Sequence, residues 1–227
     1  MGRPVRTVAP QWPYVDTYYP GLYVGVDGLD GSGRTTLANE LHRQLQSHGY
    51  PSVVTGPFPS KKSQTQNTLN KHDRRVGDTS RHLLYASFLA IVMHEVILPH
   101  LRAGYIVISD RSWISLYARA TAQGLDKNWV TTSLGFALQP DLVIEPAATP
   151  LTAARRKLAG AEALDPLESV GGRSQLSGFI AFQEQIQTLL APLRQQLPWH
   201  VVEDIKNLDQ MARIIHRIEA ESEGLPS

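Results

Sequence analysis

A glycine-rich segment after a short apolar run carries the most informative chemistry of this chain. Residues 28–35 read Gly-Leu-Asp-Gly-Ser-Gly-Arg-Thr. This order fits the phosphate-loop pattern G-x-x-x-x-G-K-[ST] at every fixed position except the lysine, which is Arg34. Glycines let backbone N–H groups turn inward around an anion, and a following helix adds its positive N-terminus. A ligand-free turn is the alternative, but strand and helix flank the motif correctly, so we predict a nucleotide-phosphate site at Gly28, Asp30, Gly31, Ser32, Gly33, Arg34, Thr35 and Thr36.

Arg34 is the departure from the pattern. A lysine ammonium is a compact charge that sits between the β- and γ-phosphates, whereas a guanidinium group is larger and planar. An arginine that bridges phosphates bidentately would displace its charge centre by about an ångström or more. We therefore assign Arg34 a catalytic role and keep weak or altered catalysis as an open alternative.

Asp110 and Arg111 form the second candidate element, at the end of the β-branched run 105–110. In a parallel sheet, ligands collect at the carboxyl ends of the strands. We expect Asp110, a catalytic candidate, to hold Mg²⁺ together with Thr35, and Arg111 to hold a substrate phosphate. A surface ion pair is the alternative. Arg111 stands where mechanical ATPases carry a second carboxylate, which favours phosphoryl transfer over hydrolysis.

The elements that must position these residues alternate along the chain. Apolar, β-rich runs without polar alternation are typical of strands covered on both faces, and helical segments fill the intervals. The pattern predicts an α/β fold with a parallel sheet and helices on both faces. The expected strands are 22–27, 52–55, 105–110, 141–145 and 199–203, and the expected helices are 35–47, 80–101, 112–122, 129–138, 150–159, 175–197 and 207–222.

Composition limits the classes of function. The 227 residues favour one large domain, and the chain has no cysteine, which excludes disulfide scaffolds, thiolate metal sites and a cysteine nucleophile. The net charge of +1 argues against broad binding to duplex nucleic acid. No stretch approaches 18 consecutive apolar residues, so we expect no membrane span, and the absence of a signal peptide makes the cytoplasm the default location.

Five segments in order resemble thymidylate kinases: 28–36, 58–61 (Phe-Pro-Ser-Lys), 83–86, 109–112 (Ser-Asp-Arg-Ser) and 140–144. The resemblance covers about residues 21–222. It implies the P-loop NTPase fold of nucleoside-monophosphate kinases, with a five-stranded parallel core, a small lid near 160–174, ATP and Mg²⁺ as cosubstrates, and a homodimer. An irregular arm, 1–20, would precede this domain and a tail, 223–227, would follow it.

The resemblance also implies roles at matching positions. Asp30 matches the residue that contacts the acceptor sugar, and Arg111 the arginine beside the acceptor phosphate. Gly31 stands where one branch of the family has a catalytic arginine; the other branch supplies arginines from the lid, where this chain has only Arg173. The remaining matches are substrate-binding: Phe58 and Lys61 for base and phosphate, and Tyr85 and Phe88 beside the base.

Leu89 is the most consequential departure, because thymidylate kinases carry a base-reading arginine at this position. Losing a donor aimed at a pyrimidine carbonyl removes much of the discrimination for thymine. The expected function is ATP-dependent conversion of dTMP to dTDP. The alternatives are a kinase of the same fold for another deoxynucleotide, a modified pyrimidine nucleotide or a nucleoside, and a catalytically weak nucleotide-binding protein.

Overall fold

The structure is a computed structural model that describes residues 3–4, 18–57, 77–160, 164, 175–204 and 207–223. Three predicted site residues, Phe58, Lys61 and Arg173, lie outside the described residues, as do most of the expected arm, nearly all of the expected lid and the end of the tail.

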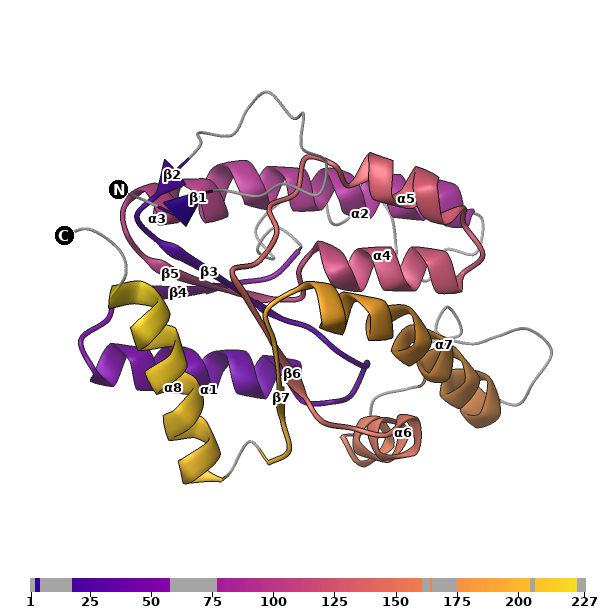
Figure 1. Cartoon of the computed structure of the whole chain (residues 1–227). Helices are drawn as coiled ribbons and strands as arrows, with labels where there is room; N and C mark the ends of the chain where they lie inside the picture. Colours follow the sequence, from indigo (N-terminus) through magenta and orange to yellow (C-terminus); the bar gives the residue numbers. More distant parts are fainter. Residues whose placement is uncertain are drawn as a thin grey trace.

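A five-stranded sheet forms the centre of the fold (Figure 1). Its order is β4-β5-β3-β6-β7, and all four neighbouring pairs are parallel. β3 lies at the centre of the sheet, and all of its residues, Leu-Tyr-Val-Gly-Val, are buried. A strand with no charged side chain is suited to this position. The predicted parallel α/β sheet is confirmed, with strands β3 (Leu22–Val26), β4 (Ser52–Thr55), β5 (Ile106–Asp110), β6 (Leu142–Pro146) and β7 (Trp199–Val202).

Helices cover both faces of the sheet, as predicted, and each face has its own apolar core. Helices α1 (Arg34–Ser47) and α8 (Leu208–Glu223) lie on one side in Figure 1. Leu37, Leu41 and Leu45 recur at helical spacing on α1 and are buried against this face. The larger core on the other face is covered by α2 (Asp78–Val92), α3 (Leu98–Arg102), α4 (Trp113–Ala122), α5 (Lys127–Ser133) and α7 (Gln175–Gln196), while α6 (Pro150–Ala159) packs on α7.

One predicted helix is shorter than expected. The sequence predicts a helix over 129–138, but α5 begins at Lys127, where the Asp126 carboxylate accepts from Trp129 N at 2.8 Å, and ends at Ser133. Gly135 follows, and glycine is a poor helix former. A turn follows over residues 134–136, and the apolar residues Ala137 and Leu138 beyond it are still buried but are not helical.

Helices α2 and α3 join through a π-helical turn, Met93–Ile97, into one long helix. Pro99 lacks a backbone donor and would disrupt regular hydrogen bonding at this point, which a wider turn accommodates. By length and composition alone, residues 78–102 would be able to cross a membrane. Leu89, Val92 and Ile97 of this helix are buried in the larger core, which accounts for its apolar composition.

The described part of the N-terminal arm is partly regular, in contrast to the expected irregular arm. β1 (Arg3–Pro4) pairs antiparallel with β2 (Tyr18–Tyr19). Tyr19 is buried, and the Arg102 guanidinium lies 5.7 Å from the centre of its ring. A cation over an aromatic face is a favourable contact, so β2 is held at the end of α3.

Candidate active site at the phosphate loop

The phosphate loop connects β3 to α1 at the carboxyl edge of the sheet. Three of its residues have positive φ angles: Gly28 (137°), Gly31 (85°) and Gly33 (102°). L-residues with a side chain rarely adopt these conformations, which explains the glycine spacing in the sequence. Ser32 is buried inside the loop, and Thr36 follows on the exposed side of α1.

Thr35 and Asp110, predicted from the sequence to share a Mg²⁺ site, lie in contact. The Thr35 hydroxyl donates to Asp110 Oδ2 at 2.6 Å. The contact joins the start of α1 to the end of β5, strand neighbour of β3. A hydroxyl and a carboxylate oxygen side by side are the ligand types that Mg²⁺ takes beside nucleotide phosphates. In the described part of the chain, no three His, Cys, Asp or Glu side chains gather into a metal site.

Arg34 is folded back against its own loop. Its Nη1 donates to the Gly28 carbonyl oxygen, and its Nη2 donates to Asp30 Oδ1 at 2.8 Å. The side chain is buried, and burial together with the nearby Arg111 lowers the pKa of Arg34. A guanidinium group therefore fills the inside of the turn, and its planar fork bridges two loop acceptors.

Asp30 is the centre of a charged cluster. Its Oδ1 also accepts from Arg111 Nη2 at 2.6 Å, and its Oδ2 accepts from Arg119 Nη2 at 3.0 Å. The backbone N–H of Asp30 donates to Gln183 Oε1 on α7 at 3.0 Å. Burial alone would raise the pKa of Asp30, but the guanidinium groups of Arg111, Arg119 and Arg34 hold it well below its usual range. Asp30 is therefore an ionised, buried carboxylate.

Arg111 has a backbone conformation that is unusual for its type. Its φ is 78°, and it is the one non-glycine residue with positive φ in the part of the chain that the structure describes. Two hydrogen bonds hold the turn: Arg111 N–H donates to the Val26 carbonyl at 3.0 Å, and the Ser109 hydroxyl donates to the Arg111 carbonyl at 2.7 Å. Strain of this kind persists only where the surroundings impose it, and it is common at functional sites.

Asp27, which was not predicted as a site residue, fixes the other side of this turn. It is fully buried and accepts from Ser112 Oγ at 2.6 Å, Ser112 N at 3.1 Å and Ser115 Oγ at 2.5 Å. Burial raises the pKa of Asp27, and these hydrogen bonds partly offset the effect. Ser112 also caps α4 by accepting from Ile114 N. Asp27 thus ties the loop to the start of α4.

A third buried carboxylate, Glu145, supports the loop from β6. Glu145 accepts two hydrogen bonds from Arg194 of α7, at 2.8 and 2.7 Å, and one from Trp199 Nε1 at 2.9 Å. A Cβ atom at Gly28 would lie 3.1 Å from Glu145 Cγ. Gly28 therefore packs directly on this ion pair, and the position of the loop depends on β6 and α7.

Gly31 packs closely against α6. A Cβ atom at Gly31 would lie 2.5 Å from the Ala153 carbonyl oxygen and 2.8 Å from Lys157 Cγ. From the same helix, Arg156 Nη1 donates to the Ser32 carbonyl at 2.7 Å. No side chain fits at position 31, where one branch of the resembled family has an arginine, and α6 brings a different arginine to the loop.

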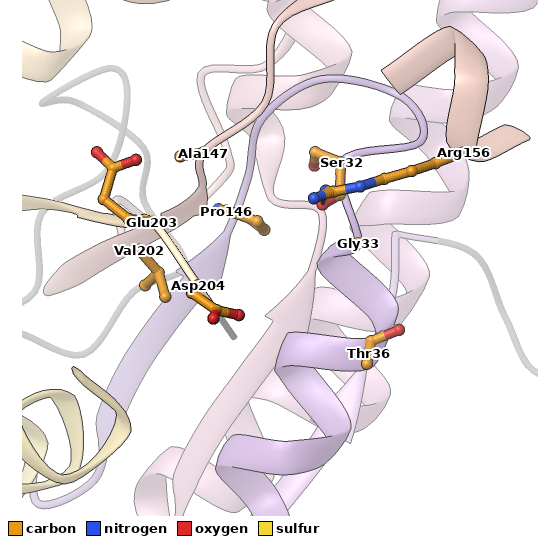
Figure 2. A pocket seen from close by; sticks show the side chains of 9 residues that line it. All are labelled: Ser32, Gly33, Thr36, Pro146, Ala147, Arg156, Val202, Glu203 and Asp204. Atoms are coloured by element: carbon orange, nitrogen blue, oxygen red, sulfur yellow. Dashed lines mark hydrogen bonds between the residues drawn. The ribbon is translucent and has the colours of Figure 1, made fainter. Parts of the chain in front are cut away.

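A cavity of about 360 Å³ lies beside the loop, and Arg156 forms one of its walls (Figure 2). The volume is within the range of pockets for nucleotide-sized ligands. Loop and helix residues form one side and the ends of β6 and β7 the other. The lining residues are Ser32, Gly33, Thr36, Pro146, Ala147, Arg156, Val202, Glu203 and Asp204.

On α2, Tyr85 is half-buried, and Phe88 and Leu89 are buried. Tyr85 packs against the larger core, and Leu89 belongs to it. The base contacts expected of Tyr85 and Phe88 stay predictions. Leu89 is fully buried, and its apolar side chain has no hydrogen-bond donor to offer a base.

Other residues of the site were missing from the sequence analysis. Ser112, Ser115 and Arg119 follow Asp110 at helical spacing, so a helical projection of 112–122 would have placed them on one face. Gln183 lies within α7 far along the chain, and no local pattern marks it. Its contact with Asp30 exists only because the tertiary fold brings α7 under the loop.

Fold and site together define a class of protein. The glycine-rich loop joins a central parallel strand to a helix, and a threonine hydroxyl contacts an aspartate carboxylate at its edge. This is the arrangement of P-loop nucleotide-binding proteins. The sequence model of the thymidylate kinase family matches residues 26–207. The chain therefore belongs to the thymidylate kinase family.

Individual relatives agree with this membership. The chain is 32% identical over 139 residues to a probable thymidylate kinase of Thermococcus gammatolerans, which covers 55% of this chain and 64% of that protein. It is 34% identical to a probable thymidylate kinase of Pyrococcus horikoshii, over 55% of this chain and 63% of that protein. A thymidylate kinase of Caenorhabditis elegans is 26% identical over 208 residues, 87% of this chain and 89% of that protein.

Proposed function

We propose that this protein transfers the terminal phosphoryl group of ATP to dTMP and forms dTDP. One observation carries the proposal: the same loop makes a hydrogen bond on each side. Thr35 donates to Asp110 at 2.6 Å on the donor side, and Asp30 accepts from Arg111 at 2.6 Å on the acceptor side. Membership in the thymidylate kinase family and the names of the relatives support the choice of reaction.

On the donor side, the residues bind and orient ATP. Backbone N–H groups of the loop and the N-terminus of α1 bind the phosphates, and the cavity beside Arg156 accepts the nucleoside part. Thr35 and Asp110 would hold Mg²⁺, which neutralises phosphate charge when bound. Arg34 stabilises the negative charge of the transferring group from inside the loop.

On the acceptor side, Arg111 holds the phosphate of dTMP. The strained turn at this residue fixes the direction of its side chain, and Asp27 and Ser109 fix the turn. Phosphoryl transfer needs no covalent intermediate with the protein, because positioning and charge stabilisation supply most of the catalysis. The proposed roles of Phe58 and Lys61 at the acceptor, and of Arg173 in a closing lid, complete this arrangement.

A second candidate function is a kinase of the same class for a different acceptor. The full burial of Leu89, in place of a base-reading arginine, favours it. Without that donor, discrimination between thymine and related bases falls on shape and apolar contact, which separate ligands by only about 1–3 kcal/mol.

A panel of acceptors tests both functions. The purified protein is incubated with ATP, Mg²⁺ and each of dTMP, dUMP, dCMP, dAMP, dGMP and thymidine, and diphosphate or monophosphate products are quantified. The proposal requires dTMP to have the highest kcat/KM. Turnover of another acceptor without turnover of dTMP would establish the second candidate.

Substitution at Asp110 tests the assignment of the donor side. We expect Asp110→Asn to lower kcat by roughly 100-fold or more and to raise the Mg²⁺ concentration at half-maximal rate. Glu184→Gln, an isosteric change of an exposed carboxylate on α7, serves as the control and should leave both values unchanged. Full turnover of Asp110→Asn at low Mg²⁺ would contradict the metal assignment.

We further propose a cytoplasmic homodimer, on the basis of family membership. The described surface of α2 presents Leu83 and Ile91 to solvent, and exposed apolar residues on one helix face are a common feature of interfaces. Light scattering after gel filtration measures the mass directly: 25.1 kDa would indicate a monomer and contradict the dimer.

A further inference from the structure

Three guanidinium groups meet on one buried carboxylate beside the phosphate loop. Asp30 Oδ1 accepts from Arg34 and Arg111, and Oδ2 accepts from Arg119. The side chains of Asp30 and Arg34 are only 7% and 6% exposed. Asp110 also acts electrostatically on Arg34, so two carboxylates face the three arginines, and these five side chains carry a formal charge of +1. The side chains of Arg111 and Arg119 are 28% and 17% exposed, so an anion can reach both guanidinium groups.

Two of the three arginines come from the acceptor side of the loop. Arg34 belongs to the loop itself, because its Nη1 donates to the Gly28 carbonyl. Arg111 and Arg119 come from the segment that leaves β5 and forms α4, and their Nη2 atoms bind opposite oxygens of Asp30. Asp30 therefore fixes the positions of both guanidinium groups at once.

We propose that Arg119 binds the 5′-phosphate of the acceptor together with Arg111, and that Asp30 is the positioning residue that aligns the two guanidinium groups. The inference rests on the proposed function and assigns a substrate-binding residue to it. Arg119 adds a second arginine, on a rigid helix, to the acceptor phosphate site.

Charge decides between the phosphate and the sugar as the group that Arg119 binds. A monophosphate carries about −1.5 to −2 at pH 7, and the partly exposed guanidinium groups of Arg111 and Arg119 lie close enough on Asp30 to bind such an anion together. A sugar hydroxyl carries no charge and would have to compete with ion pairs for Asp30, since both of its oxygens already accept from arginine. Arginine binds phosphate through strong, charge-assisted hydrogen bonds.

The geometry of α4 supports the assignment. Ser112, Ser115 and Arg119 lie on one helix face, and all three contact carboxylates at or near the loop: Asp27 for the serines and Asp30 for the arginine. Two rigid anchors within the first turn thus determine where the third residue points. A side chain held in this way can place a phosphate contact accurately.

The test compares Arg119→Gln with Arg43→Gln in calorimetric titrations of dTMP and 3′-deoxythymidine monophosphate. Arg43 is 64% exposed on α1 and pairs with Glu40, so it controls for loss of one arginine. We expect Arg119→Gln to weaken binding of both nucleotides roughly 10- to 100-fold, with the KM for ATP changed by less than about twofold. Arg43→Gln should bind both nucleotides as the wild type does.

Two further comparisons distinguish the phosphate from the sugar and the base. If Arg119→Gln weakens binding of dTMP but not of 3′-deoxythymidine monophosphate, Arg119 contacts the 3′-hydroxyl of the sugar and the proposal is overturned. The affinity of the wild type should fall as the phosphate gains a proton below about pH 6, and Arg119→Gln should flatten this profile. An unchanged pH profile would mean that Arg119 contacts the base, and it would also overturn the proposal.

A structural role for Arg119 predicts a different result. Gln183→Met removes a neutral contact of Asp30 and leaves all three arginines in place. If it weakens dTMP binding as much as Arg119→Gln, displacement of Asp30 explains the loss and the proposal fails. Arg119→Lys keeps the charge, and a loss of affinity smaller than that of the glutamine variant is expected.

Failure of the proposed function has its own signature. If the wild type binds dTMP but transfers no phosphoryl group to it, the proposed function fails, while the binding comparison between the variants still decides the role of Arg119. If the wild type does not bind dTMP, both proposals are overturned.

Discussion

Arg34 places a guanidinium group inside a loop that usually holds a lysine. We expect Arg34→Lys to keep kcat at or above the wild-type value, because a compact ammonium group approaches the transferring phosphoryl group more closely. Arg34→Gln, which removes the charge, should lower kcat roughly 100-fold or more. Steady-state kinetics with ATP, Mg²⁺ and dTMP measure both variants. If lysine and glutamine reduce kcat equally, the site needs the fork of the guanidinium group rather than its charge.

Asp30 makes the stability of the fold depend on pH. The folded-state pKa of Asp30 lies well below its value in the unfolded chain, which is near 3.9. The carboxylate therefore stabilises the protein fully above this value, and the stabilisation is lost as the pH falls through about 4 toward the folded-state pKa.

Substitution of Asp30 tests this dependence. Asp30→Asn leaves Arg34, Arg111 and Arg119 without their shared anion, so we expect the free energy of unfolding at pH 7 to fall by about 3–5 kcal/mol. The difference from the wild type should shrink at pH 3. Urea denaturation at pH 7, 5 and 3 measures both curves. A difference that stays constant over this range would exclude Asp30 as the titrating group.

At the level of elements, the packing of the loop on α6 leaves no room for a side chain at Gly31. The Cβ atom of Gly31→Ala would meet the backbone oxygen of Ala153, which cannot rotate away, and the φ of 85° disfavours any L-residue. We expect the variant to lose about 2–4 kcal/mol of stability and to move the loop relative to α6, with a lower kcat/KM. Urea denaturation and kinetics measure the two effects.

Gly49 supplies a matched control. It also has a φ of 85°, but a Cβ atom there would have no neighbour within 4 Å. Gly49→Ala therefore costs only the backbone strain, about 1–2 kcal/mol, and should leave kcat/KM unchanged. Equal losses of stability in the two variants would show that the contact with α6 contributes nothing.

At the level of the whole molecule, the nucleotide site joins elements that are distant in the chain. The cavity wall includes residues from the loop, α6 and the ends of β6 and β7, so ATP bound there as proposed would contact four separate parts of the fold. At 100 times its Kd, ATP stabilises the protein by about 2.7 kcal/mol, which for this size raises the Tm by about 5–10 °C.

Thermal unfolding with and without ATP and Mg²⁺ tests this coupling. The shift should shrink when EDTA replaces Mg²⁺, and Asp110→Asn should show the smaller shift even with Mg²⁺ present. A Tm that ATP does not change in the wild type would contradict the proposed nucleotide site.

Much of the fold and the loop side of the site were predictable from local patterns. The β-branched run ending at Asp110 indicated a strand covered on both faces, and the glycine-rich motif indicated a loop between a strand and a helix. Gly28, Gly31 and Gly33 of this loop have positive φ angles. The predicted end of the helix at residue 138 was wrong, because the apolar residues after Gly135 continue a helical pattern in the sequence although α5 ends at Ser133. Hydrophobic periodicity indicates which residues are buried, and buried residues occur both in helices and in irregular segments packed on the core.

The sequence by itself determined the parallel sheet, the phosphate loop and the meeting of Thr35 with Asp110, because each depends on residues close in the chain or on the common edge of parallel strands. Only the tertiary structure decided the charge arrangement around Asp30. Arg119 and Gln183 reach this carboxylate from α4 and α7, and no local pattern encodes a contact between elements that packing brings together. The chain has a net charge of only +1, and it is the fold that brings three arginines together on one carboxylate.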